Sequence, residues 1–120
     1  MNALDKADAL KERTKQFAIR IVAVSRSLPR SREADVIGKQ LLRSGTAVAA
    51  NYRAVCRARS KAEFISRMGI VVEEADETVF WLELLGDTGL APAAKLALLL
   101  KELVAICAAS LRTAKHNKVA

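Results

Sequence analysis

The 120-residue sequence predicts an all-α protein, a single antiparallel up-and-down four-helix bundle that occupies residues 1–120. About half of the residues are apolar, and there are only two prolines and five glycines, a composition that favours long helices. Apolar residues recur at alternating spacings of four and three, the pattern of one buried helix face. This pattern occupies residues 7–28, 32–58, 61–85 and 92–114, and the short connections between them favour antiparallel neighbours.

The first predicted helix, residues 7–28, ends before Pro29, because proline disfavours the helical conformation in the residue that precedes it. Ser31 is suited to cap the next helix, with Glu33 and Asp35 in its first turn, where acidic side chains are stabilising. The residues of the first helix with the four-three spacing are Leu10, Thr14, Phe17, Ile21, Val24 and Leu28.

The second predicted helix, residues 32–58, places apolar and basic side chains on different faces. Asn51 falls within its apolar seam, where one amide often fixes the register between helices, so we favour a structural role for Asn51 over contact with a ligand. The seam consists of Ile37, Leu41, Ser44, Val48, Asn51 and Val55. Four basic residues within an arc of about 80° form the other face, here called the basic stripe: Lys39, Arg43, Arg53 and Arg57.

The third predicted helix, residues 61–85, begins at a capping box formed by Ser60 and Glu63. Its seam is Phe64, Met68, Val71, Ala75, Thr78, Leu82 and Leu85. The remaining surface combines large apolar groups with acids, and a large exposed apolar patch usually marks an interface. We therefore predict self-association through Ile70, Glu73, Glu77, Phe80, Trp81 and Leu84. The acids Glu73, Glu74, Asp76 and Glu77 are expected to pair with basic groups of a neighbouring helix or subunit.

The fourth predicted helix, residues 92–114, follows a turn bracketed by Gly86 and Gly89 and starts near Pro92, which suits a first helical turn. Its most apolar stretch is interrupted by charges, which a membrane span does not tolerate well. We expect no membrane segment. Two cysteines without framework spacing and no signal peptide indicate a reduced, cytoplasmic protein. The seam of this helix is Leu96, Leu100, Leu103 and Cys107.

The net charge of +7 is confined to one segment. Residues 26–61 hold nine basic and two acidic residues, so the rest of the chain is neutral. A localised excess of this kind attracts polyanions, nucleic acid first. Few residues are aromatic, so we expect binding to duplex or structured RNA or DNA rather than to stacked single strands. The predicted phosphate contacts are Lys39, Arg43, Arg53 and Arg57, with Arg59 and Lys61 at the following turn.

No combination of residues in the sequence indicates catalysis. His116 is the only histidine, and Cys56 and Cys107 have no ligand pair nearby in sequence, so we predict no metal site and no cofactor. A nucleophile also needs an oriented base, which a histidine near the end of the chain does not offer. The sequence therefore predicts a protein that is not an enzyme.

Three motifs resemble those of a known bacterial family. They are QLLRSGTAVAANYR at residues 40–53, SKxEF at residues 60–64 and EEADETxxWLELL at residues 73–85. They resemble the four-helix bundle proteins encoded in intervening sequences of large-subunit ribosomal RNA genes, and the accessory protein of diversity-generating retroelements is a relative. The similarity extends over nearly the whole chain.

This resemblance implies an up-and-down bundle that assembles as a homopentameric ring, without known catalytic activity, and binds nucleic acid through a basic surface. In the retroelement relatives the partner is a reverse transcriptase with its RNA. Arg43, Asn51 and Arg53 occupy matching motif positions. The family commonly follows the Asn-x-Arg unit with Glu-Ala, where this chain has Ala54-Val55, a change that makes the second helix more basic.

Two alternatives to a nucleic-acid-binding protein remain open from the sequence. The first is an assembly scaffold, in which the arginines of the second helix pair with acids of the third helix across subunits. The second is an accessory subunit whose partner is a protein such as a reverse transcriptase. The surroundings of the basic stripe distinguish these cases, because arginines that are already paired with acids are not free to bind phosphate.

Overall fold

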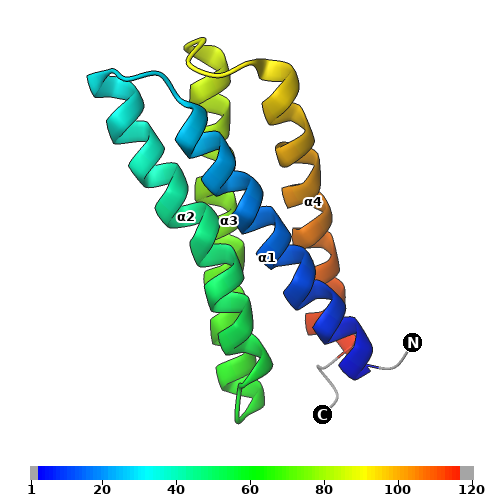
Figure 1. Cartoon of the computed structure of the whole chain (residues 1–120). Coiled ribbons are helices and arrows are strands. Elements are labelled where there is room, and N and C mark those ends of the chain that lie inside the picture. The colour runs from blue at the N-terminus through cyan, green and yellow to red at the C-terminus, as the bar shows by residue number, and fades with distance from the viewer. Residues whose placement is uncertain (1–2, 117–120) are drawn as a thin grey trace.

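The computed structural model describes residues 3–116, of which the side chains of residues 5–113 are placed. These residues form four helices and no strand: α1 (Ala3–Ser27), α2 (Arg32–Cys56), α3 (Lys61–Asp87) and α4 (Ala93–His116). Figure 1 shows successive helices running in opposite directions, with α1 packed against α2 and α4, and α3 against the same two helices. The predicted all-α up-and-down bundle is therefore confirmed. The molecule is elongated, 49 × 24 × 18 Å.

The helix boundaries agree with the prediction to within four residues, and α4 ends at His116 rather than residue 114. α1 begins at Ala3 rather than residue 7, α2 ends at Cys56 rather than residue 58, and α3 continues to Asp87 rather than residue 85. Acidic Asp5 lies in the first turn of α1, where it complements the positive end of the helix dipole. An earlier start of α1 is favourable for that reason.

Serine side chains cap α2 and α3, as predicted. The hydroxyl of Ser31 accepts a hydrogen bond from the Ala34 amide, and that of Ser60 accepts one from the Glu63 amide, both at 3.1 Å. The Glu63 carboxylate in turn accepts the backbone N–H of Arg59 at 3.2 Å. It thus reaches one residue further back than a standard capping box.

A Schellman motif ends α3 and explains the two extra residues of this helix. The Leu90 amide donates to the Leu85 carbonyl at 3.0 Å and the Gly89 amide to the Gly86 carbonyl at 3.1 Å, the pair of bonds that defines this motif. Gly89 has φ 72°, a conformation that costs glycine nothing. Gly86 therefore belongs to the helix, and Gly89 alone turns the chain.

The predicted seams meet along the axis of the bundle. Every seam residue named above is buried or partly buried, and Leu99 and Ile106 of α4 join the core as well. Tyr52, which the seam spacing leaves out, is also in the core with 1% exposure. On α4, by contrast, Leu98, Val104 and Leu111 remain exposed. No described helix is long and apolar enough to cross a membrane.

A glycine lets α1 and α2 approach closely. A Cβ atom built on Gly45 would lie 2.8 Å from both Cγ atoms of Ile21, a separation that real Cβ contacts essentially never show. Ile21 is fully buried, so it has no solvent-side position to move into. The absence of a side chain at Gly45 therefore sets the distance between the two helices.

A polar pair lies in the buried seam between α2 and α3. The Thr78 hydroxyl lies 2.9 Å from Ser44 Oγ and 2.7 Å from the Glu74 carbonyl, and both residues are fully buried. Asn51 is partly buried and donates to the Ala47 carbonyl of its own helix at 2.9 Å. The buried side-chain hydrogen bond that joins α2 and α3 is therefore the one between Thr78 and Ser44. Asn51 takes no part in it.

Candidate nucleic-acid interface

Three residues of the basic stripe are exposed, two on the outer face of α2 and Arg57 directly after the last residue of this helix. Lys39, Arg53 and Arg57 are exposed and form no ion pair with any side chain that the structure describes. At a rise of about 1.5 Å per residue, Lys39 and Arg53 lie about 21 Å apart along α2. Charges spaced over that length suit an extended polyanion better than a single small anion, because duplex DNA carries one charge per about 1.7 Å of its axis.

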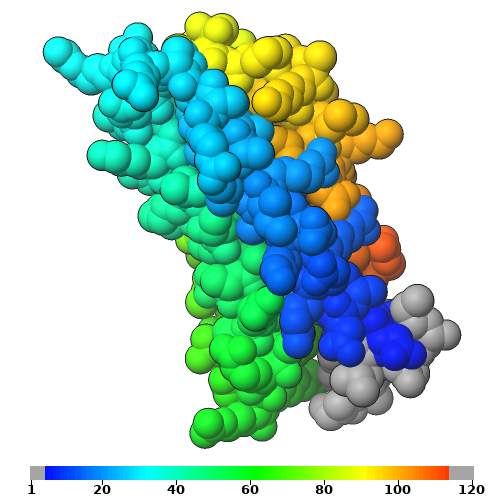
Figure 2. Space-filling model, in the orientation of Figure 1, coloured from blue at the N-terminus to red at the C-terminus, as the bar shows by residue number. Residues whose placement is uncertain are grey.

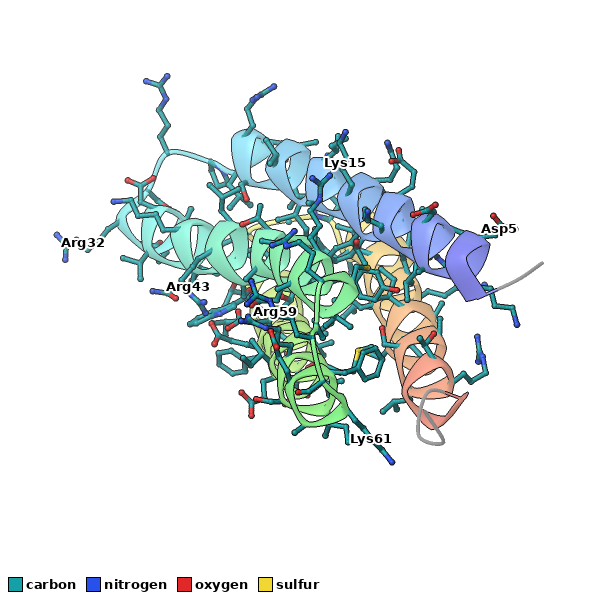
Figure 3. All side chains as sticks on the ribbon, turned by 90° about the horizontal axis from the view of Figure 1, so that it is seen from below. Asp5, Lys15, Arg32, Arg43, Arg59 and Lys61 are labelled. Carbon is teal, nitrogen blue, oxygen red and sulfur yellow. The ribbon has the colours of Figure 1, made fainter. Side chains whose placement is uncertain are left out.

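Arg43, the fourth residue of the stripe, is already paired inside the chain. Its guanidinium bonds the Glu74 carboxylate at 3.1 Å and also hydrogen-bonds the carboxylate of Glu77, both on α3. Hydrogen bonding to Glu77, followed by charge interaction with Glu74, raises the pKa of Arg43. Figure 3 shows Arg43 on α2 beside α3, whereas Arg32 extends away from the bundle. Arg43 therefore joins two helices, and its contact with phosphate stays a prediction.

Glu77 is shared between Arg43 and Trp81. The indole Nε1 of Trp81 donates to Glu77 Oε2 at 3.0 Å. This bond and the bond from Arg43 lower the pKa of Glu77. Two of the four α3 acids, Glu74 and Glu77, thus pair with the neighbouring helix as expected, but within one chain. Glu73 and Asp76 are exposed and have no ion pair among the described side chains.

Arg59 lies in the turn between α2 and α3, Lys61 is the first residue of α3, and both side chains are exposed. Within the described part of the chain, neither forms an ion pair. Glu63, the nearest acid in the sequence, is occupied by the Arg59 backbone and by Arg67, which it binds at 3.1 Å. These bonds, that of the Arg59 backbone first, lower the pKa of Glu63. The charges of Arg59 and Lys61 therefore extend the positive surface of α2 around the turn.

The residues predicted to form an oligomer interface share one side of α3 and remain partly accessible. Phe80 is 53% exposed and Ile70 37% exposed, and the Phe80 and Trp81 rings stack edge to face with centroids 4.9 Å apart. Trp81, Leu84 and Glu77 are half-buried, and Glu73 is exposed. The six residues thus form a mixed apolar and acidic surface next to the Arg43 ion pairs.

Sequence reasoning missed two cations near the stripe. Arg26 at the end of α1 and Arg30 in the α1–α2 connection line an open groove together with Lys39 of α2. The excess charge of residues 26–61 included both arginines. No helical spacing relates them to the stripe, however, because they precede α2.

No described residues form a centre for metal chemistry. Among side chains that the structure describes, no three or more His, Cys, Asp or Glu residues lie close enough together to hold a metal ion. Cys56 and Cys107 are free thiols, and burial, with the nearby Asp76 charge, raises the pKa of Cys107. His116 lies outside the residues with described side chains.

Taken together, fold and surface define a small helical bundle with an apolar core, an exposed cationic face on α2 and an acidic, partly apolar face on α3. A family model described as 23S rRNA-intervening sequence protein matches residues 8–110. A crystal structure of a protein with unknown function from the S23 ribosomal protein family of Bacteroides thetaiotaomicron is 34% identical. The match covers 92% of this chain and 98% of that chain, with a TM-score of 0.85. No curated protein matches this chain.

The chain belongs to the 23S rRNA-intervening sequence protein family. This confirms the family resemblance of the three motifs, all of which fall within the matched residues. The family's description names a ribosomal RNA gene context, and the related structure is described as of unknown function. Neither description attaches a reaction to the fold.

Proposed function

We propose that this protein binds duplex or structured nucleic acid, without catalysis, through the outer face of α2 and the α2–α3 turn. The observation that carries the proposal is the set of exposed cations on this surface that no described carboxylate neutralises. They are Lys39, Arg53, Arg57, Arg59 and Lys61. Arg43 is left out, since its charge is paired with α3.

Binding of this kind depends on the release of counterions from the phosphate backbone. Each phosphate contact contributes about 0.9 to the slope of log affinity against log salt concentration for duplex DNA. Phosphate contacts supply affinity and orientation but carry no sequence information. We therefore expect steep salt dependence with little preference among sequences.

The test compares two double variants with the same change in charge. Arg53→Gln with Arg57→Gln removes two cations from the proposed surface. Lys95→Gln with Lys101→Gln removes two exposed cations from α4. Affinity for a labelled DNA duplex and a labelled RNA hairpin is measured across a salt series, with the mass of each protein checked in the same buffer.

The α2 variant should reduce the salt slope by about 2, while the α4 variant leaves it close to the wild-type value. Equal losses in both variants would mean that only net charge matters. An absence of binding by the wild type would remove the proposal altogether.

A second candidate function is an assembly scaffold, and the surface of α3 favours it. Phe80 and Ile70 are exposed beside Glu73, whose carboxylate has no ion pair among the described side chains. A second copy would cover this surface and bring cations of its α2 to these acids. We propose a closed homo-oligomer, a pentamer on the family resemblance, that presents the remaining basic surface outward to RNA or DNA.

Light scattering distinguishes the scaffold from the nucleic-acid-binding protein. If Phe80→Asp yields monomers that still bind the duplex, assembly and binding use separate surfaces. If Arg53→Gln with Arg57→Gln yields smaller species and the wild type ignores nucleic acid, the arginines belong to the interface and the scaffold is the better proposal. If the protein binds no nucleic acid but specifically retains a reverse transcriptase, it is instead an accessory subunit.

A further inference from the structure

An open groove of about 290 Å³ lies between the end of α1 and the first turns of α2. The segments that line it, residues 25–30 and 34–42, occupy the upper end of the molecule in Figures 1 and 2. This end is opposite the α2–α3 turn that carries Arg59 and Lys61. The groove therefore lies at the far end of the proposed binding surface.

Three cations from three consecutive segments line this groove. Arg26 belongs to α1, Arg30 to the connection and Lys39 to α2, and all three line the groove. They are exposed, and none forms an ion pair with a side chain that the structure describes. One carboxylate, that of Asp35, is present in the lining. The groove therefore keeps an excess of positive charge, which favours an anion.

Apart from Ser25, the remaining lining residues are small or apolar. Gly38 contributes no side chain, and Leu28 lies so close that a Cβ at Gly38 would be 3.0 Å from Leu28 Cδ1. Leu42 is 38% exposed in the same lining. Such a lining offers apolar contact beside the charges, as most ligand sites do.

Ser25 adds a polar group to the wall. Its hydroxyl oxygen is buried and has no hydrogen-bond partner among the described residues, and Ser25 lines the groove. A buried hydroxyl without a partner costs free energy. Because the hydroxyl oxygen is covered in this structure, an anion in the groove would reach it only after a small movement of the wall, and accepting its hydrogen bond would then recover that cost.

We propose that this groove binds a phosphate group, held by Arg26, Arg30 and Lys39 and by the Ser25 hydroxyl. The proposal extends the proposed function, because Lys39 belongs to both surfaces and would connect the groove to the α2 track. A backbone phosphate of bound nucleic acid would then occupy the groove, with its sugar against Leu42. A free oligophosphate offers the same chemistry and is the other source.

Charge-matched variants test the groove. Arg26→Gln with Arg30→Gln removes two lining cations. Arg20→Gln with Arg32→Gln removes two exposed arginines that lie outside the lining. Salt series with the DNA duplex and RNA hairpin form one arm, and the shift in thermal midpoint with added sodium pyrophosphate forms the other.

If a backbone phosphate occupies the groove, the groove variant lowers the duplex salt slope by about 2 and the control variant does so by much less. If a free oligophosphate is the source, pyrophosphate raises the midpoint of the wild type and the control but not of the groove variant. This second result supports the groove even if nucleic acid never binds and the proposed function fails. Indistinguishable groove and control variants in both arms would overturn the proposal.

Ser25→Ala provides a readout that involves no change in charge. Loss of one hydrogen bond should weaken phosphate binding about two- to tenfold, without lowering the thermal midpoint of the unliganded protein. Unchanged affinity for both the duplex and pyrophosphate would contradict the assigned role of the hydroxyl.

Discussion

The guanidinium of Arg43 on α2 binds the carboxylate of Glu77 on α3, which also accepts the indole N–H of Trp81. This pairing separates Arg43, which joins two helices, from the other residues of the predicted basic stripe, whose charges remain available to a ligand. It also explains how α3 can carry Glu73, Glu74, Asp76 and Glu77 near one another, since Arg43 offsets the repulsion of two of them.

Replacement of Arg43 should affect stability more than binding. Arg43→Gln breaks the bonds to Glu74 and Glu77, so we expect a small reduction in the free energy of unfolding, because the pairs are largely accessible to solvent. Arg53→Gln, which breaks no described ion pair, should leave stability unchanged and weaken duplex affinity. Urea unfolding and duplex titration of the two variants check this separation. If Arg43→Gln instead leaves stability unchanged and abolishes the affinity for the duplex, Arg43 is one of the phosphate contacts.

Stability should fall at acidic pH through three paired carboxylates. Bonds from Trp81 and Arg43 lower the pKa of Glu77, bonds from Arg13 lower that of Glu102, and bonds from the Arg59 backbone and Arg67 lower that of Glu63, all from an ordinary value of 4.5. A depressed pKa in the folded state adds stability above the unfolded value, and this stability is lost as the pH falls through the folded pKa. Urea midpoints between pH 7 and pH 3 should therefore decrease below about pH 4.5.

Single variants assign this pH dependence to particular groups. Glu77→Gln should flatten the decrease, because the substituted side chain does not titrate. Glu73→Gln is the matched control, since Glu73 is exposed without an ion pair among the described side chains. Equal flattening in both variants would point to a general charge effect rather than to the Arg43–Glu77–Trp81 contacts.

Removal of an unpartnered hydroxyl from α4 should stabilise the protein. Ser110 is fully buried, and its Oγ has no hydrogen-bond partner among the described residues. An unsatisfied buried polar group costs about 1–3 kcal/mol, and alanine is also the better helix former. Ser110→Ala should therefore raise the free energy of unfolding by about 1 kcal/mol or more. If urea denaturation instead gives a lower free energy of unfolding for Ser110→Ala, the hydroxyl has a hydrogen-bond partner in solution.

Local signals in the sequence predicted the fold well. Pro29, Ser31 and Ser60 mark helix ends through backbone chemistry that needs no distant partner, and the four-three spacing located the core faces. The extra length of α3 was missed because Gly86 and Gly89 are alike in sequence. Only the register of the Schellman bonds shows which of them leaves the helix.

The candidate site was harder to predict, because it depends on how neighbouring helices align. On α2, Arg43 and Arg53 lie at opposite edges of an arc of about 80°. Helical spacing alone gives them equal roles, and only the placement of α3 beside Arg43 separates them. The groove cations Arg26 and Arg30 likewise meet Lys39 through the turn between two helices. No single helical period relates such residues.

The close approach of α1 and α2 provides the strongest test of the packing. Gly45→Ala places a Cβ 2.8 Å from two carbon atoms of the buried Ile21 side chain. Overpacking costs about 1–3 kcal/mol, which outweighs a helix-propensity gain of up to about 1 kcal/mol. The variant should therefore unfold at lower urea concentration.

Gly69→Ala is the matched control for this substitution. Gly69 is exposed within α3, and a Cβ there meets nothing within 4 Å, so alanine should stabilise the protein by about 0.5–1 kcal/mol. An Ile21→Ala background removes both contacts at 2.8 Å and leaves only the Cβ of residue 21 at 3.2 Å, so Gly45→Ala should cost less there than in the wild type. Additive free energies in this double-mutant cycle would show that Gly45 and Ile21 are not in contact. The spacing of α1 and α2 would then have another cause.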